Sequence, residues 1–182
     1  MTKIFINYRT ADEPYGATLL DQELSRHFGR EMVFRDAESI PLGADFETEI
    51  MAAVRDSDIL LAVIGPNWLT AADAAGNVLL DNERDFVRRE IATALEHGVR
   101  VIPVLMNATR IVPGALPADI AGLARCQDVR VDFRNSTFDL GALVDRLREL
   151  TGKPIPSPEP ERATIKAQFN DQVTVQRDFV IN

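Results

Sequence analysis

The chain has 182 residues, 46% of them hydrophobic, which is enough to bury the core of one domain that carries a short extension. Its 20 basic and 28 acidic residues give a formal net charge of −8. This charge excludes broad nucleic-acid binding, which needs a basic surface. It does not exclude a small anionic ligand such as a dinucleotide, which needs only a few local arginines and backbone N–H groups.

Short apolar runs alternate with amphipathic helical patterns along the first 150 residues. In chain order we expect a strand over 3–8, a helix over 14–28, strands over 31–35 and 58–64 on either side of a helix over 43–55, a helix over 83–97, a strand over 99–106, a short helical turn over 117–123, a strand over 128–133 and a helix over 138–150. Gly98 stands where a helix C-terminus favours glycine.

Three of the helices carry an apolar stripe that predicts which side is buried. For 14–28 the stripe is Leu19, Leu20, Leu24 and Phe28. For 43–55 it is Phe46, Ile50 and Val54. For 83–97 it is Val87, Ile91, Ala94 and Leu95.

This alternation predicts an α/β protein with a flavodoxin-like three-layer fold and a five-stranded, mostly parallel sheet. Ligands of such sheets bind at the carboxyl ends of the strands. The composition changes after residue 150, so we expect a domain over 1–150, a Pro-rich linker over 151–164 and a β-prone segment over 165–182.

Cysteine content and hydropathy predict a soluble, cytoplasmic protein without membrane contact. The single cysteine, Cys126, allows no intrachain disulfide and is expected to be an inert buried thiol. The chain starts like a strand, without a signal peptide, and its longest apolar run, 59–64, is too short to span a membrane.

Several families share this architecture, and their signature motifs are missing. The first strand ends Asn7-Tyr8-Arg9, without the acidic residues of a response regulator or the phosphate loop of a flavodoxin. Neither a G-x-G-x-x-G motif nor a P-loop is present.

Four segments in order resemble the boxes of bacterial-type TIR (Toll/interleukin-1 receptor) domains over about residues 1 to 150. Phe5-Ile6-Asn7-Tyr8-Arg9 resembles the first box, with Asn7 in place of the common serine. Val33-Phe34-Arg35-Asp36 and Ile40-Pro41-Leu42-Gly43 resemble the second box and its BB loop. Residues 59–68 resemble the third strand and its exit, and 85–91 resemble the catalytic helix, with Phe86 in place of a tryptophan.

The resemblance implies an NAD+ glycohydrolase or cyclase with Glu90 as the catalytic carboxylate. The nicotinamide of NAD+ leaves as a neutral pyridine, so no general acid is needed. The transition state places positive charge on the ribose, which one carboxylate can stabilise. NAD+ is the substrate, and we expect neither a further cofactor nor a metal. By its mid-helix position alone, Glu90 would be a solvated surface residue.

Further residues are expected to bind the substrate, each with a plainer alternative. Phe86 lies four residues before Glu90 and would form an apolar wall beside it. Arg9 and Arg35 end neighbouring strands, where a guanidinium could meet a pyrophosphate or form an ion pair. By resemblance Tyr8 or Phe5 contacts the nucleotide, with core packing as the alternative for both.

Three predicted substrate-binding residues follow strand exits. Trp68 would line the cleft or fill the core. Asp36 would order the loop that contains Gly43. By resemblance that loop is a lid and assembly loop, and its alternative is an ordinary turn.

The tail from Phe169 to Asn182 alternates apolar residues with amides, a composition typical of steric zippers. It is similar to amyloid-signalling motifs of the V-Q-x-R-D class that follow bacterial effector domains, where a sensor protein carries a matching motif. The alternatives are an extra strand on the sheet edge or a disordered end.

Three functions stay open at this point. The first is an NAD+ glycohydrolase or cyclase that is activated by self-association and acts in antiphage defence or regulated cell death. The second is a non-enzymatic TIR adaptor that assembles with itself or a partner. The third is an enzyme like the nucleoside deoxyribosyltransferases, which share the architecture and also use a glutamate.

Overall fold

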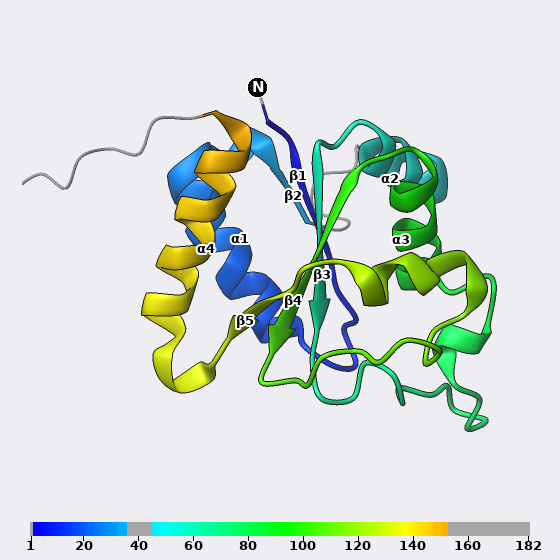
Figure 1. The fold of residues 1–182 in the computed structure, drawn as a ribbon. Coiled ribbons are helices and arrows are strands. Elements are labelled where there is room, and N and C mark those ends of the chain that lie inside the picture. The colour runs from blue at the N-terminus through cyan, green and yellow to red at the C-terminus, as the bar shows by residue number, and fades with distance from the viewer. Residues whose placement is uncertain (1, 36–44, 153–182) are drawn as a thin grey trace, which may run out of the picture.

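The computed structural model describes residues 2–35 and 45–152. Within them, five parallel strands form one sheet in the order β2-β1-β3-β4-β5, with helices on both faces (Figure 1). The predicted three-layer α/β fold is confirmed. The predicted linker and β-prone tail lie outside the described residues, apart from Thr151 and Gly152.

The strands fall within the predicted ranges, and each is shorter than predicted. They are β1 (Ile4–Asn7), β2 (Val33–Phe34), β3 (Ile59–Ile64), β4 (Arg100–Met106) and β5 (Val129–Val131). In register, Ile4 of β1 lies opposite Val33 on one side and Ile59 on the other. The residues that follow β1 therefore leave the sheet from its interior.

The helices match the predicted order, and two of them start later than predicted. They are α1 (Pro14–Phe28), α2 (Phe46–Arg55), α3 (Phe86–Glu96) and α4 (Ser136–Thr151). The side chains of Asp45 and Asp85 accept backbone N–H bonds and cap α2 and α3, which sets their first residues. Gly98 has φ of 72° after α3, as its predicted position requires.

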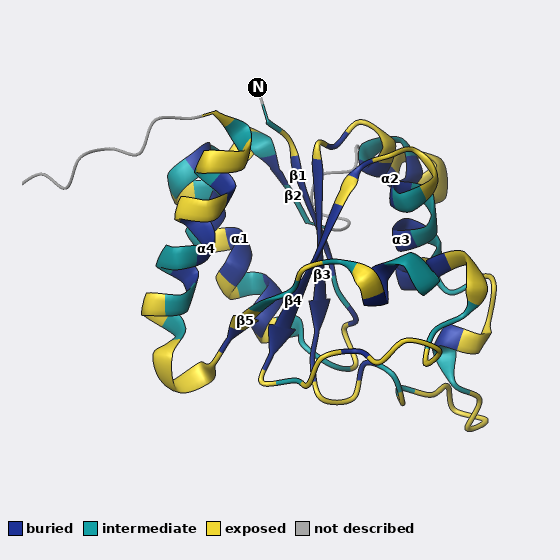
Figure 2. Ribbon diagram, viewed as in Figure 1, coloured by how far each residue is buried: buried dark blue, intermediate teal, exposed yellow. Residues whose placement is uncertain are grey.

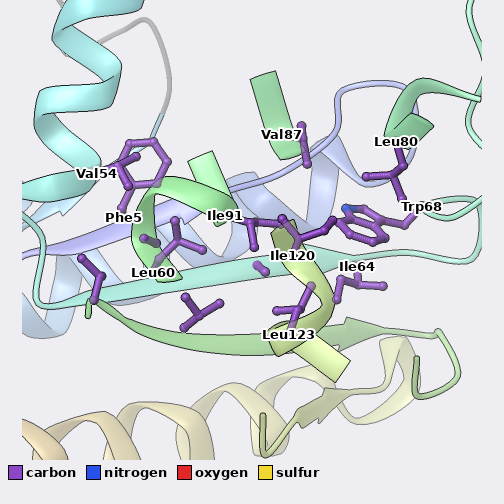
Figure 3. Close-up of a cluster of buried hydrophobic side chains, with 14 of the residues drawn as sticks. Phe5, Val54, Leu60, Ile64, Trp68, Leu80, Val87, Ile91, Ile120 and Leu123 are labelled. Atoms are coloured by element: carbon purple, nitrogen blue, oxygen red, sulfur yellow. The ribbon is translucent and has the colours of Figure 1, made fainter. Parts of the chain in front are cut away.

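A separate hydrophobic core lies between each face of the sheet and the helices that pack on it (Figure 2). Helices α1 and α4 pack on one face, while α2, α3 and the 3₁₀ segment Ala118–Arg125 pack on the other. Figure 3 shows the second core, in which Trp68 lies beside Ile64 and Leu80. No described helix is long and apolar enough to cross a membrane.

Two stripe residues are less buried than the sequence predicts. Leu19 is 38% exposed, because Leu20, one residue further round α1, takes the inward direction instead. Phe46, the first residue of α2, is 40% exposed. Ile50 and Val54 are buried as predicted.

Replacing Gly141, inside α4, by alanine is expected to raise the free energy of unfolding by about 0.5–1 kcal/mol, because glycine weakens a helix interior. A Cβ built there meets no atom within 4 Å. The matched control is Gly16→Ala in α1. There the Cβ would lie 2.6 Å from Met106 Cε and 2.8 Å from the capping Glu13 Oε1, so these side chains would have to shift and the same gain in stability is not expected. Urea unfolding measures both, and a loss of stability in Gly141→Ala would contradict the prediction.

Candidate functional site

A cleft of about 360 Å³ opens at the carboxyl end of β1, where the predicted fold places ligands. It lies between the segment that follows β1 and the first turns of α2 and α3. Its described lining is Phe5, Ile6, Tyr8, Arg9, Thr10, Ala11, Phe46, Leu79, Phe86, Val87 and Glu90.

Glu90 projects from α3 into the wall of this cleft and is only 8% exposed. The side chain of Asn7, at the end of β1, donates from Nδ2 to Glu90 Oε2 over 2.6 Å. The same Nδ2 donates to the carbonyl oxygen of Val87 over 3.2 Å. A carboxylate on a rigid helix is thus fixed against the central part of the sheet, which is the preorganisation that charge stabilisation needs.

Arg9 lies two residues further along the chain and forms a two-pronged ion pair with Asp85. Its Nη1 and Nη2 donate to Asp85 Oδ1 and Oδ2 over 2.9 and 2.8 Å. Arg9 is 4% exposed, and the carboxylate of Asp85 also caps α3 by accepting the N–H of Arg88. The pair therefore fastens the start of α3 to the end of β1.

Two aromatic rings form the apolar side of the cleft. Phe46 and Phe86 meet edge to face, with ring centroids 5.9 Å apart and an interplanar angle of 77°. Arg89 lies over the Phe86 ring, 5.6 Å from its centroid, and pairs with Glu47 of α2. Both rings are 40% exposed, so flat apolar surface is presented beside the carboxylate.

Asp12 joins the segment after β1 to the exit of β3. Its Oδ2 accepts the N–H of Gly65 over 2.7 Å, and its Oδ1 accepts the N–H of Asn67 over 2.8 Å. A Cβ on Gly65 would lie 2.6 Å from Asp12 Oδ2, so the contact requires glycine at this position. These bonds hold two strand exits together at the carboxyl edge of the sheet.

The structure brings together Tyr8, Arg9, Phe86 and Glu90 from the predicted site, with Phe5 beside them. Asp36 and Gly43 lie outside the described residues. The other two predicted residues are not part of the described cleft lining.

Arg35 lies against α1, where its Nη1 donates to Thr18 Oγ1 and its Nε is 3.6 Å from Asp21 Oδ2. Trp68 is 1% exposed within the core, so a ligand in the cleft cannot reach its ring, and its position corresponds to the packing alternative.

Asn7, Phe46 and Asp85 are among the residues of the site that the sequence analysis did not predict as site residues. Asn7 was noted only as a departure from serine, although it alternates to the same face of β1 as Phe5. Phe46 was assigned to the core because it continues the α2 stripe. Asp85 carried a visible signal, an acidic residue directly before an amphipathic helix, but its pairing with Arg9 depends on tertiary packing.

Neither the cysteine nor the possible metal-binding side chains indicate a second site. Burial raises the pKa of the Cys126 thiol, which lowers its thiolate fraction and agrees with an inert role. Among residues 2–35 and 45–152, no three His, Cys, Asp or Glu side chains gather so that they could hold a metal ion.

Comparisons with known proteins show a family, a relative and a shared fold. A family model described as TIR domain matches residues 4–148. The chain is 29% identical over 128 residues to NAD(+) hydrolase SARM1 of Danio rerio, which covers 70% of this chain but only 17% of that protein's length. The TIR domains in the structure of the activated Roq1 resistosome directly recognizing the pathogen effector XopQ superpose with a TM-score of 0.56 at 14% identity, covering 83% of this chain and 99% of theirs. That likeness shows the fold alone.

Proposed function

Since the chain belongs to the TIR domain family, we propose that it is an NAD+ glycohydrolase, which breaks the bond between nicotinamide and ribose with Glu90 as the catalytic carboxylate. The observation that carries this proposal is the position of Glu90. It is a buried acidic side chain in the wall of a cleft, fixed by a short hydrogen bond from Asn7 and flanked by exposed aromatic surface.

Cleavage of the nicotinamide–ribose bond needs few catalytic groups beyond this carboxylate. The nicotinamide takes the electrons of the glycosidic bond and leaves as a neutral base, so no proton has to be delivered. Positive charge develops on the ribose, and the Glu90 carboxylate stabilises it. Phe46 and Phe86 offer flat surface on which the departing base can pack.

The second product depends on what attacks the ribose. Water gives linear ADP-ribose, and an atom of the adenine base gives a cyclic product. The similarity to a protein named NAD(+) hydrolase supports cleavage of NAD+ and leaves this choice to experiment.

Activity is further proposed to depend on self-association. The Roq1 TIR domains are those of an activated resistosome, and the BB-loop residues Ile40, Pro41 and Gly43 resemble an assembly loop, outside the described residues. The proposed setting is bacterial antiphage defence or regulated cell death, with a sensor protein whose motif matches the segment 165–182. That segment also lies outside the described residues.

The direct test is to incubate the full chain with NAD+, and separately with a deoxynucleoside, and to follow the released base over a range of protein concentrations. We expect nicotinamide release from NAD+, no cleavage of the deoxynucleoside, and a rate that rises more steeply than protein concentration. Product mass distinguishes hydrolysis from cyclisation. Cleavage of the deoxynucleoside alone would favour the transferase-like enzyme, and inert protein that has visibly assembled would favour the adaptor.

A further inference from the structure

We propose that Asn7 is the positioning residue of this site, which holds the Glu90 carboxylate in its working orientation; the inference rests on the proposed function. Asn7 is fully buried, and its amide lies between β1 and α3. It does not itself line the cleft, so it acts through Glu90 and not on the substrate.

The neighbours of the amide decide which of its ends faces Glu90. The oxygen of Val87 is a backbone carbonyl and can only accept, so the group 3.2 Å from it must be the NH2. That same NH2 lies 2.6 Å from Glu90 Oε2. The carboxylate therefore accepts a hydrogen bond from Asn7 on this side.

The other end of the amide shows what this arrangement costs. Asn7 Oδ1 is buried and has no hydrogen-bond partner among the described residues. A buried acceptor without a partner is unfavourable and calls for an explanation. Here both donors of the amide are directed at α3 while its acceptor is left unsatisfied. This arrangement orients the Glu90 carboxylate at a cost in folding stability.

The position of Asn7 at the end of a paired strand makes its contact with Glu90 rigid. It ends β1 and is paired with Ala62 of β3, and the same strand is held on its other side by β2 through Ile4 and Phe5. Glu90 lies in the second turn of α3, whose start is fastened to the next stretch of chain by the Arg9–Asp85 pair. The distance from Nδ2 to Oε2 is thus set by two well-held elements. A carboxylate kept within about 1 Å of its productive position preserves roughly 100-fold in rate.

The first test needs no enzymatic activity. In the ¹⁵N-labelled full chain, the side-chain NH2 resonance of Asn7 is compared between wild type and Glu90→Leu. We expect a wild-type resonance that exchanges slowly with solvent and that shifts and exchanges faster once the carboxylate is gone. An Asn7 resonance unchanged by Glu90→Leu would overturn the proposal.

The second test separates positioning from a merely structural role. Asn7→Leu keeps a similar volume and removes the donor, and we expect kcat for nicotinamide release to fall about 10- to 100-fold while KM changes little. The matched control is Asn135→Leu, an exposed asparagine directly before α4 that does not line the cleft, which should leave both constants unchanged. Unaltered kcat in folded Asn7→Leu would also overturn the proposal. If wild type releases no nicotinamide, the proposed function fails, and the resonance test still decides whether Asn7 holds Glu90.

Discussion

Replacing Glu90 by glutamine is expected to lower nicotinamide release by about 100- to 1000-fold, the usual effect of removing one preorganised electrostatic group. Glutamine has the same shape and still offers an oxygen to Asn7 Nδ2, now 2.6 Å from Oε2. What it lacks is the negative charge that opposes the positive charge developing on the ribose. The loss should therefore fall on kcat, with NAD+ binding largely kept.

The matched control is Glu96→Gln, which makes the same chemical change on the same helix. Glu96 is exposed at the last turn of α3 and does not line the cleft. We expect it to retain wild-type release. Both variants should keep the wild-type unfolding midpoint to within a few degrees, because a neutral amide is easier to bury than a carboxylate. Equal release by wild type and Glu90→Gln would show that another group carries the chemistry.

The order and type of the elements could be predicted from the sequence because each one carries its own period. The run over Ile59–Ile64 is continuously apolar, as a strand covered on both faces must be, and α3 repeats its apolar residues at helical spacing. The starts of α2 and α3 were placed too early because the aspartates that cap them were not used as boundaries.

Strand alternation explains why Arg9 and Arg35 lie on different faces. Phe5 stacks on Phe34 with ring centroids 5.8 Å apart, on the face covered by α2 and α3. Asn7 and Arg9 follow Phe5 at intervals of two and share its face, so both reach α3. Arg35 follows Phe34 by one residue and turns to the opposite face, against α1. This much was available from the sequence.

Other features of the site needed the tertiary structure. Trp68 directly follows a loop that leaves the sheet, and nothing in the sequence says whether its ring turns inward. It does so because the space among Ile64, Leu80 and Ile120 accommodates an indole (Figure 3). The pairing of Arg9 with Asp85, 76 residues apart, follows from how α3 packs on β1.

Replacing Asp85 by alanine is expected to destabilise the protein by about 3–5 kcal/mol, the usual effect of leaving a buried charge without its partner. The side chains of Arg9 and Asp85 are only 5% and 9% exposed, so removing the carboxylate leaves the Arg9 guanidinium largely buried without its partner. The variant also removes the cap of α3, which costs about 1 kcal/mol in most helices. Urea unfolding measures the change.

Arg9→Met should be the milder change, because Asp85 can still accept the N–H of Arg88 and cap the helix. In the double variant Arg9→Met/Asp85→Ala, the two charges are removed together, so no buried charge is left without its partner. It should be more stable than the sum of the single losses predicts, by about 1–3 kcal/mol. Additive losses, or a cost below about 1 kcal/mol for Asp85→Ala, would show that the pair contributes little to the fold.

The same variants decide between the two roles open to Arg9. If its guanidinium also binds the pyrophosphate of NAD+, Arg9→Met should raise the KM for NAD+ even under conditions in which the variant is fully folded. If it serves only to fasten α3, the KM should stay near the wild-type value wherever the protein is folded. The two-pronged pairing with Asp85 uses Nη1 and Nη2, the atoms that a phosphate would also engage. We therefore expect an unchanged KM. In this role Arg9 supports Glu90 by holding Asp85 at the start of α3.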